Sequence, residues 1–402
     1  MQRLFPGSAK ISFNPHQLLP LFIAFYLVVS MVSISLSQIF LFLAFLSWLF
    51  LLIREKQKPS FPSFFWPLLA YSLLSLISSF RSVNPQVSLK DSRELLLYLV
   101  VPMVYTAFRS EKTLRQANLA LLGSAFLSLI YSFYYFFFQA YPGERITGFM
   151  GHYMTQAGLL LLFSAMALSM SFFSKHKTRF LWGLGFLLSL VALTLTLTRS
   201  CWIGVVVAAC VILFLYKPRT LIIVPVAVGL FFLASPEYIK ERALSSVSLN
   251  TESNKHRIEY IRAGVRIIRN YPLLGTGPDT VDMEFQNPKY KLSEKARMNV
   301  HLHNNIIQIA AERGIPTAAA WLTFMLWTFF SLTRLWRKKD PRLYPFTAAA
   351  LAALGGLAAA GLFEYNFADS EIATLFLYMM SAPFALDRIR KKKANPHKEP
   401  ES

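Results

Sequence analysis

The sequence predicts an all-α, polytopic integral membrane protein with about twelve transmembrane helices and one large periplasmic loop. Three observations support this fold class. The 402 residues are 54% hydrophobic and only 15% charged. Apolar runs recur at close to the length of about 20 residues that a helix needs to cross a bilayer. Basic residues concentrate in alternate connections between these runs, which is the pattern of a multi-pass membrane protein.

The apolar segments follow one another with short polar connections between most of them. We expect spans at residues 18–36, 39–53, 64–80, 95–108, 117–138, 154–173, 180–198, 201–216, 220–234, 316–335, 344–363 and 371–385. The first segment is expected to be a retained span rather than a cleaved signal peptide. Cys201 and Cys210 fall in one of these helices, so we expect no disulfide between them.

The distribution of Lys and Arg predicts the orientation of the chain. The basic connections are residues 54–58, 109–115, 175–179, 217–219 and 334–342, together with Arg3 and Lys10 at the N-terminus and the 388–393 segment. The short connections between them are poor in Lys and Arg, so both termini should be cytoplasmic. The net charge of +20 is thereby explained by membrane topology and not by binding to nucleic acid.

This topology divides the chain into four parts. Residues 1–234 form an N-terminal membrane bundle, 235–315 a periplasmic loop with the active-site helices, 316–388 the C-terminal spans, and 389–402 a basic cytoplasmic tail whose last residues, from 394, should be disordered. The long loop contains Leu, Ile, Tyr and Phe throughout. We therefore expect it to be folded, and loops of this length are usually functional when they are ordered.

Arg199 is the first candidate for chemistry, because it is the only charged residue between Phe180 and Tyr216. It should lie at the tight outer turn between two spans. One interpretation is an arginine that reaches the lipid headgroups, with Trp202 as an interfacial anchor. The alternative is a functional residue, since ionisable groups at membrane depth usually face a cavity.

A predicted helix over residues 254–270 distributes its arginines unequally. Arg262, Arg266 and Arg269 form one polar stripe, whereas Arg257 lies in the apolar arc of the helix. A guanidinium there requires an anionic partner or a cavity. Arg257 is therefore the strongest candidate of the four.

The stretch 299–317 concentrates polar residues directly before a span. Read as a helix, it places His303 on one face with Ile307 and Gly314. The helix should end at Arg313, because Gly314 suits a helix C-terminus and Pro316 suits the first turn of the next helix.

Two arginines and a histidine on one side of a membrane suggest displacement on a sugar diphosphate. The arginines would bind the diphosphate, since their guanidinium groups match phosphate oxygens and stay charged. Histidine titrates near neutrality and suits a general base. We take His303, Arg199 and Arg257 as catalytic candidates. The substrate-binding candidates are Arg199, Arg257, His301, Asn304, Asn305 and Arg262. We expect neither metal nor cofactor, because too few ligands lie near the histidines for zinc.

At these residues the chain resembles the O-antigen ligase family. The family motif of His and a polar residue, nine residues, Gly, two residues and Thr is matched by His303-Asn304, Gly314 and Thr317. Arg199 matches an arginine at the end of a span. Arg257, followed by Asn270 to Gly277, resembles the family's Arg-X-X-X-Trp helix and Asn-Pro-Leu-Leu-Gly-X-Gly turn, with Ile261 in place of Trp and Tyr271 inserted.

The resemblance implies a glycosyltransferase of the C-type fold in the bacterial inner membrane. It implies transfer of a glycan from undecaprenyl diphosphate to lipid A–core on the periplasmic side, with inversion and without metal. We expect a monomer in contact with membrane lipids. O-antigen polymerases and protein O-oligosaccharyltransferases share the motif and remain alternatives. A twelve-span transporter is a more distant alternative, disfavoured because there is no internal repeat.

Overall fold

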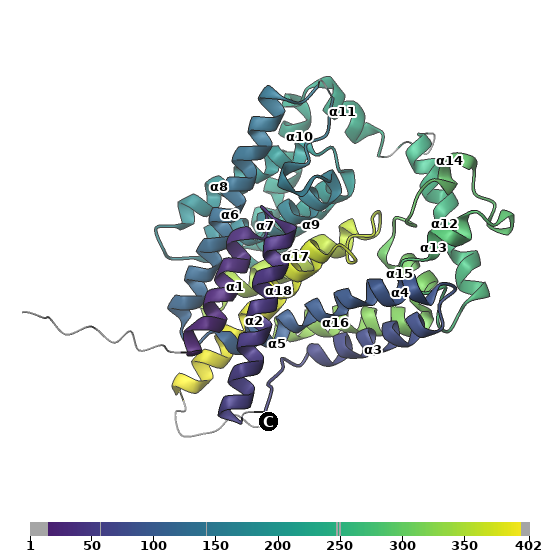
Figure 1. Cartoon of the computed structure of the whole chain (residues 1–402). Helices are drawn as coiled ribbons and strands as arrows, with labels where there is room; N and C mark the ends of the chain where they lie inside the picture. The colour runs from purple at the N-terminus through teal and green to yellow at the C-terminus, as the bar shows by residue number, and fades with distance from the viewer. Residues whose placement is uncertain (1–14, 57, 142, 247, 249–250, 395–402) are drawn as a thin grey trace, which may run out of the picture.

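The computed structural model describes residues 15–56, 58–141, 143–246, 248 and 251–394, and these contain helices and no strand. The all-α prediction is confirmed. Figure 1 shows a bundle of helices from which a pair, α3 and α16, projects toward the small helices of the long loop. Arg3, Lys10 and residues 395–402 of the expected disordered tail lie outside the described residues.

The described residues of the first half of the chain form twelve helical elements. They are η1 (Pro15–Gln17), α1 (Leu18–Val29), α2 (Ile34–Glu55), α3 (Phe65–Phe80), α4 (Pro85–Asp91), η2 (Ser92–Leu99), α5 (Val100–Ala107), α6 (Glu111–Phe138), η3 (Gly148–Met150), α7 (Tyr153–Phe173), α8 (Arg179–Leu195) and α9 (Arg199–Tyr216).

The second half begins with the last helix before the long loop. Its elements are η4 (Pro218–Ile222), α10 (Ile223–Ala234), α11 (Glu237–Leu244), α12 (Glu252–Asn270), α13 (Val281–Phe285), η5 (Pro288–Tyr290), α14 (Glu294–Arg297), α15 (Asn305–Arg313), α16 (Ile315–Trp336), α17 (Tyr344–Ala360) and α18 (Ser370–Ala394).

Six of the described helices are long and apolar enough to cross a membrane, namely α2, α6, α7, α9, α16 and α18. Five shorter apolar helices accompany them, at Pro15–Val29, α3, α8, Pro218–Ala234 and α17. The expected span at 95–108 does not form one α-helix, because η2 is followed there by the short α5. Pro102 lacks the N–H that a continuous α-helix would need at this position. Twelve crossings therefore remain a prediction.

The centre of the bundle consists of α7, α17 and α18, which are largely buried. The surrounding helices expose large apolar side chains such as Phe42, Leu187 and Leu230, as a lipid-facing surface would. Helices α9 and α17 cross closely, since a Cβ on Gly204 would lie 2.7 Å from the carbonyl oxygen of Gly356. Small residues at such a crossing let helix backbones approach in membranes. The crossing holds the start of α9 beside the segment that follows α17.

Helices α3 and α16 carry the long loop at their outer ends (Figure 1). The pair is anchored in the bundle by Phe64, whose ring packs against Phe324 and Phe384. The long loop is folded, as expected, around its own core of Tyr260, Ala263, Ile267, Val281, Phe285, Tyr290, Leu292, Ala296, Leu302 and Ala311. Because this core includes Leu302 and Ala311, the loop and α15 form one unit.

Ion pairs link the basic connections at the end of the molecule opposite the long loop. Arg342 lies 3.9 Å from Glu111, Arg390 2.7 Å from Asp340, and Lys338 2.5 Å from Asp387. His16 contacts Glu55 at the same end, through a distance of 2.7 Å. The structure thus separates the basic connections from the long loop, in agreement with the alternation in the sequence.

Candidate functional site

Arg199 is the first residue of α9 and is only 5% exposed. Its guanidinium donates to Ser245 Oγ at 2.9 Å and to Ser253 Oγ at 3.1 Å, with Asn254 Oδ1 at 3.4 Å. All three acceptors belong to the long loop and are neutral. The side chain therefore turns into the protein below the loop. This placement disagrees with an arginine that simply reaches the headgroups.

Three further arginines surround the same turn. Arg145 and Arg242 both donate to the carbonyl oxygen of Leu197, at 2.7 and 3.3 Å, and Arg257 approaches Asn254 Oδ1 at 3.5 Å. We call Arg145, Arg199, Arg242 and Arg257 the arginine cluster. Within the described part of the chain, none of the four forms an ion pair with a carboxylate. Like charges held together in this way attract an anion.

Arg257 differs from the other arginines of α12 in its surroundings. Its guanidinium lies 6.0 Å from the centre of the Phe363 ring. Burial lowers the pKa of Arg257, and the charge of Glu364 acts in the opposite direction. Arg262 is exposed on the outer surface, and Arg266 donates to the carbonyl oxygen of Tyr290 at 2.8 Å. The structure thus separates Arg257 from Arg262 and Arg266, although Ile258, Ile261 and Val265 of the expected apolar arc are exposed.

His303 does not belong to a helix, which corrects the expected shared face with Ile307 and Gly314. Its backbone has φ of +52°, and α15 begins only at Asn305. The side chain of Asn304 caps that helix by accepting from the N–H of Ile307 at 3.0 Å. The predicted end of the helix is confirmed, because α15 ends at Arg313 and Pro316 stands in the first turn of α16.

The His303 imidazole is held on both sides. Its Nδ1 lies 2.9 Å from Oε1 of Glu364, and its Nε2 lies 2.5 Å from Nδ2 of Asn299. An Nδ1–H donated to Glu364 leaves the Nε2 lone pair as the basic position, which accepts from Asn299. The arrangement is that of a histidine base oriented by a carboxylate.

Glu364 is buried, with 6% exposure. Burial acts to raise the pKa of its carboxyl, but the hydrogen bond and charge of His303 and the charge of Arg257 outweigh it and lower the pKa. The group is therefore ionised near neutral pH. Glu364 thus bonds to His303 and also interacts electrostatically with Arg257 of the arginine cluster.

His301 points elsewhere, as expected. Its ring meets Tyr365 edge-on, with 5.3 Å between ring centres, and burial lowers its pKa. Its Nδ1 has no hydrogen-bond partner among the described residues. His301, but not His303, lines a cavity of about 390 Å³, to which Glu364 also contributes.

Asn304 and Asn305 are both engaged with the segment after α17. Asn304 Nδ2 donates to the carbonyl oxygen of Leu362 at 2.9 Å. Asn305 Nδ2 donates to Asn366 Oδ1 at 2.8 Å, and its Oδ1 accepts from the N–H of Asn366 at 3.1 Å. These bonds fix the position of Glu364 relative to His303. Both asparagines therefore position the site.

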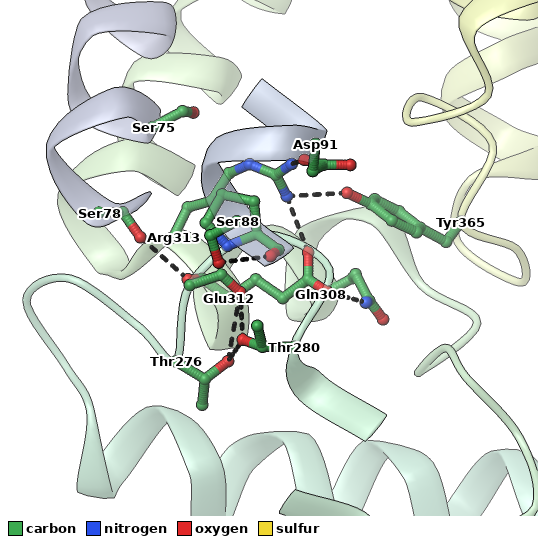
Figure 2. Close-up of polar contacts among 12 residues, drawn as sticks. Ser75, Ser78, Ser88, Asp91, Thr276, Thr280, Gln308, Glu312, Arg313 and Tyr365 are labelled. Atoms are coloured by element: carbon green, nitrogen blue, oxygen red, sulfur yellow. Dashed lines mark hydrogen bonds and ion pairs between the residues drawn. The ribbon is translucent and has the colours of Figure 1, made fainter. Parts of the chain in front are cut away.

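Figure 2 shows a buried polar network around Arg313 and Glu312, which supports the segment that carries the two histidines. Arg313 contacts Asp91 at 3.0 Å, Glu312 at 2.8 Å and the Tyr365 hydroxyl at 2.9 Å. Glu312 accepts in turn from Gln308 Nε2 at 2.8 Å, and Gln308 Oε1 accepts from the backbone N–H of Leu302 at 2.6 Å. The network thus reaches the peptide between His301 and His303.

The glycine turn after α12 fits against the end of α15. Thr276 and Gly277 donate their backbone N–H groups to the carbonyl oxygens of Ala311 and Glu312, at 2.9 and 2.7 Å. Gly275 has φ of +68°, and a Cβ there would lie 2.2 Å from the backbone carbon of Glu312. Only glycine suits this conformation and this approach. The turn therefore holds α12 and α15 together.

Glu364, Arg145 and Arg242 are not among the residues that the sequence patterns single out. Glu364 had a usable signal, since it is the first acidic residue after Asp340 and stands directly beyond an apolar segment. Arg145 and Arg242 had none, because only the fold brings residues from two separate connections to the carbonyl of Leu197.

Comparison with known proteins agrees with the motifs. Residues 184–322 match the family model described as O-antigen ligase. The match includes Arg199, Arg257, His301 and His303, whereas Glu364 lies beyond it. No curated protein matches the chain.

Proposed function

We propose that this chain, whose residues 184–322 match the family model described as O-antigen ligase, is an O-antigen ligase of the bacterial inner membrane. It transfers a glycan from undecaprenyl diphosphate to a hydroxyl group of lipid A–core on the periplasmic face. The arginine cluster carries this proposal, because four arginines with no carboxylate partner among the described residues surround one turn beside a His–Glu pair.

The diphosphate of the donor binds the arginine cluster. Arg199 and Arg257 contact neutral oxygens that a phosphate can replace, and guanidinium groups form paired hydrogen bonds with phosphate oxygens. The same charges stabilise the negative charge that grows on the leaving group. Binding and activation of the donor thus use the same four side chains, and the reaction needs no metal.

The transfer is a single displacement. His303 Nε2 takes the proton of the acceptor hydroxyl, whose oxygen would occupy the place that the amide of Asn299 holds. That oxygen forms a bond to the anomeric carbon while the bond between this carbon and the diphosphate oxygen breaks, and the diphosphate leaves with the electron pair. The configuration inverts. Glu364 keeps the imidazole oriented and stabilises its protonated form.

Transport is a weaker interpretation of this arrangement. The central helices α7 and α17 carry no Asp, Glu, Lys or Arg. The charged groups instead meet at the outer ends of the helices. Substrate sites of secondary transporters lie near the middle of the membrane.

The test is transfer by the purified protein in lipid nanodiscs. Undecaprenyl-diphosphate-linked glycan is incubated with lipid A–core, with a second lipid-linked glycan, or with a protein acceptor. Modification of lipid A–core is expected. Elongation of the lipid-linked glycan would identify a polymerase, and a modified protein would identify an O-oligosaccharyltransferase. Donor consumption with none of these products would contradict glycosyl transfer.

A further inference from the structure

The cavity that His301 lines is a second part of the site. Its lining is acidic, whereas the arginine cluster is basic. The cavity measures about 390 Å³, within the range of small-molecule sites. Six of its sixteen lining residues carry a carboxyl group, namely Asp91, Glu94, Asp279, Glu312, Glu364 and Asp369. Arg313 also lines it, but that guanidinium is paired with Asp91 and Glu312. Thr198 and Cys201, which stand on either side of Arg199 in the sequence, line it as well.

Polar groups on the cavity wall lack partners. Arg313 Nε and Asn366 Nδ2 have no hydrogen-bond partner among the described residues, although each side chain is only 5% exposed. His301 Nδ1 likewise has no hydrogen-bond partner among the described residues. Buried polar groups are nearly always hydrogen-bonded, so unpaired ones that face a cavity indicate a ligand with polar groups of its own.

The carboxyl groups also influence one another. Burial, followed by the charges of Asp91 and Asp282, raises the pKa of Asp279. Burial and the neighbouring Glu371 raise the pKa of Asp369 to about 8. Asp369 therefore holds a proton near neutral pH and can both donate and accept hydrogen bonds, whereas Glu364, whose pKa is lowered, keeps a negative charge that repels an anion. A group that both donates and accepts suits the hydroxyl groups of a sugar.

The arginine cluster and the acidic cavity therefore favour ligands of different charge. The arginine cluster attracts an anion, and the acidic cavity repels one. Glu364 belongs to both parts of the site, since it bonds to His303 and also lines the cavity. A diphosphate is excluded from the cavity by like-charge repulsion, and a neutral ring of hydroxyl groups is not.

We propose that this cavity binds the acceptor ring next to the one that reacts, because His303 Nε2 faces Asn299 and not the cavity, and that it selects an uncharged, hydroxyl-rich ring over one carrying a carboxylate or phosphate. The inference rests on the proposed glycosyl transfer for the role of the bound sugar. It names a property of the acceptor, the absence of a negative charge on the ring bound in the cavity, that the transfer reaction alone does not require.

The experiment measures sugar binding without the donor, so that it is independent of catalysis. Protein in nanodiscs is titrated with maltotriose, and with the same trisaccharide whose non-reducing glucose is oxidised to glucuronate, by ligand-observed NMR. We expect the glucuronate probe to bind at least about tenfold more weakly. The double variant Asp279→Asn/Glu94→Gln should reduce that ratio to about threefold or less. Asn tolerates the φ of +56° at Asp279.

Glu294→Gln is the matched control, because Glu294 lies on the surface of the long loop outside the cavity and should leave the ratio unchanged. Equal or tighter binding of the glucuronate probe overturns the inference. So does a ratio that the double variant leaves intact, or the absence of saturable maltotriose binding. A protein that binds maltotriose selectively but transfers no glycan keeps the cavity assignment and refutes the proposed function alone.

Discussion

Glu364→Gln isolates the contribution of the carboxylate to the histidine base. The bond to His303 is 2.9 Å long and the carboxyl group is 6% exposed. A hydrogen bond to a charged group contributes about 1.5–3 kcal/mol. If this contribution is made when the imidazole becomes protonated, its loss lowers kcat by about 10- to 150-fold, at about 1.4 kcal/mol for each factor of ten. The isosteric amide keeps the packing, so KM for the donor should change little.

The assay is single-turnover transfer across a range of pH for the wild type, Glu364→Gln, His303→Ala and His301→Ala. His303→Ala should lose about 10²–10⁴ of the rate, the usual contribution of a general base. His301→Ala should cause a partial loss.

Two results would refute this reasoning. One is a Glu364→Gln rate within twofold of the wild type. The other is a larger loss for His301→Ala than for His303→Ala, which would transfer the role of base to the histidine that lines the cavity.

Four further predictions follow from the site and its support. Arg257→Lys should lower kcat/KM by about 10²–10³-fold in a transfer assay, since it removes paired contacts to the developing charge, while Arg262→Ala on the exposed face should stay within about threefold. Activity should survive a chelator, because arginines supply the positive charge; loss that zinc or magnesium restores would contradict this. A cysteine at Ser248 should react with a membrane-impermeant reagent in intact spheroplasts. Gly275→Ala should destabilise the protein by about 2–4 kcal/mol in thermal unfolding, whereas Gly123→Ala, with open space around it, should be neutral or slightly stabilising.

Local patterns in the sequence predict local features of this fold. Gly314 and Pro316 mark a helix boundary correctly, because backbone conformation at a cap depends on few residues. The lone arginine between two apolar segments does lie at the start of α9. Both features require no knowledge of distant parts of the chain.

Features that depend on distant contacts could not be predicted in the same way. The conformation of His303 follows from the cap formed by Asn304 and from Glu364, which lies 61 residues further along the chain. Helical periodicity takes no account of such a cap, so it predicts a helix that begins too early in the chain. The same holds for the acidic cavity, because its lining residues come from seven separate stretches of the chain that only the fold brings together.

The serine contacts of α3 have a consequence for how the protein is made. Ser78 donates to the carbonyl oxygens of Leu274 and Glu312, which lie 196 and 234 residues later in the chain. At a synthesis rate of about 5–20 residues per second, these partners emerge roughly 10–50 s after the serine. During that interval the outer end of α3 cannot complete its native contacts. The catalytic half of the molecule therefore assembles late in translation, and a nascent chain that stalls before Glu312 exposes unpaired hydroxyl groups that membrane quality control can recognise.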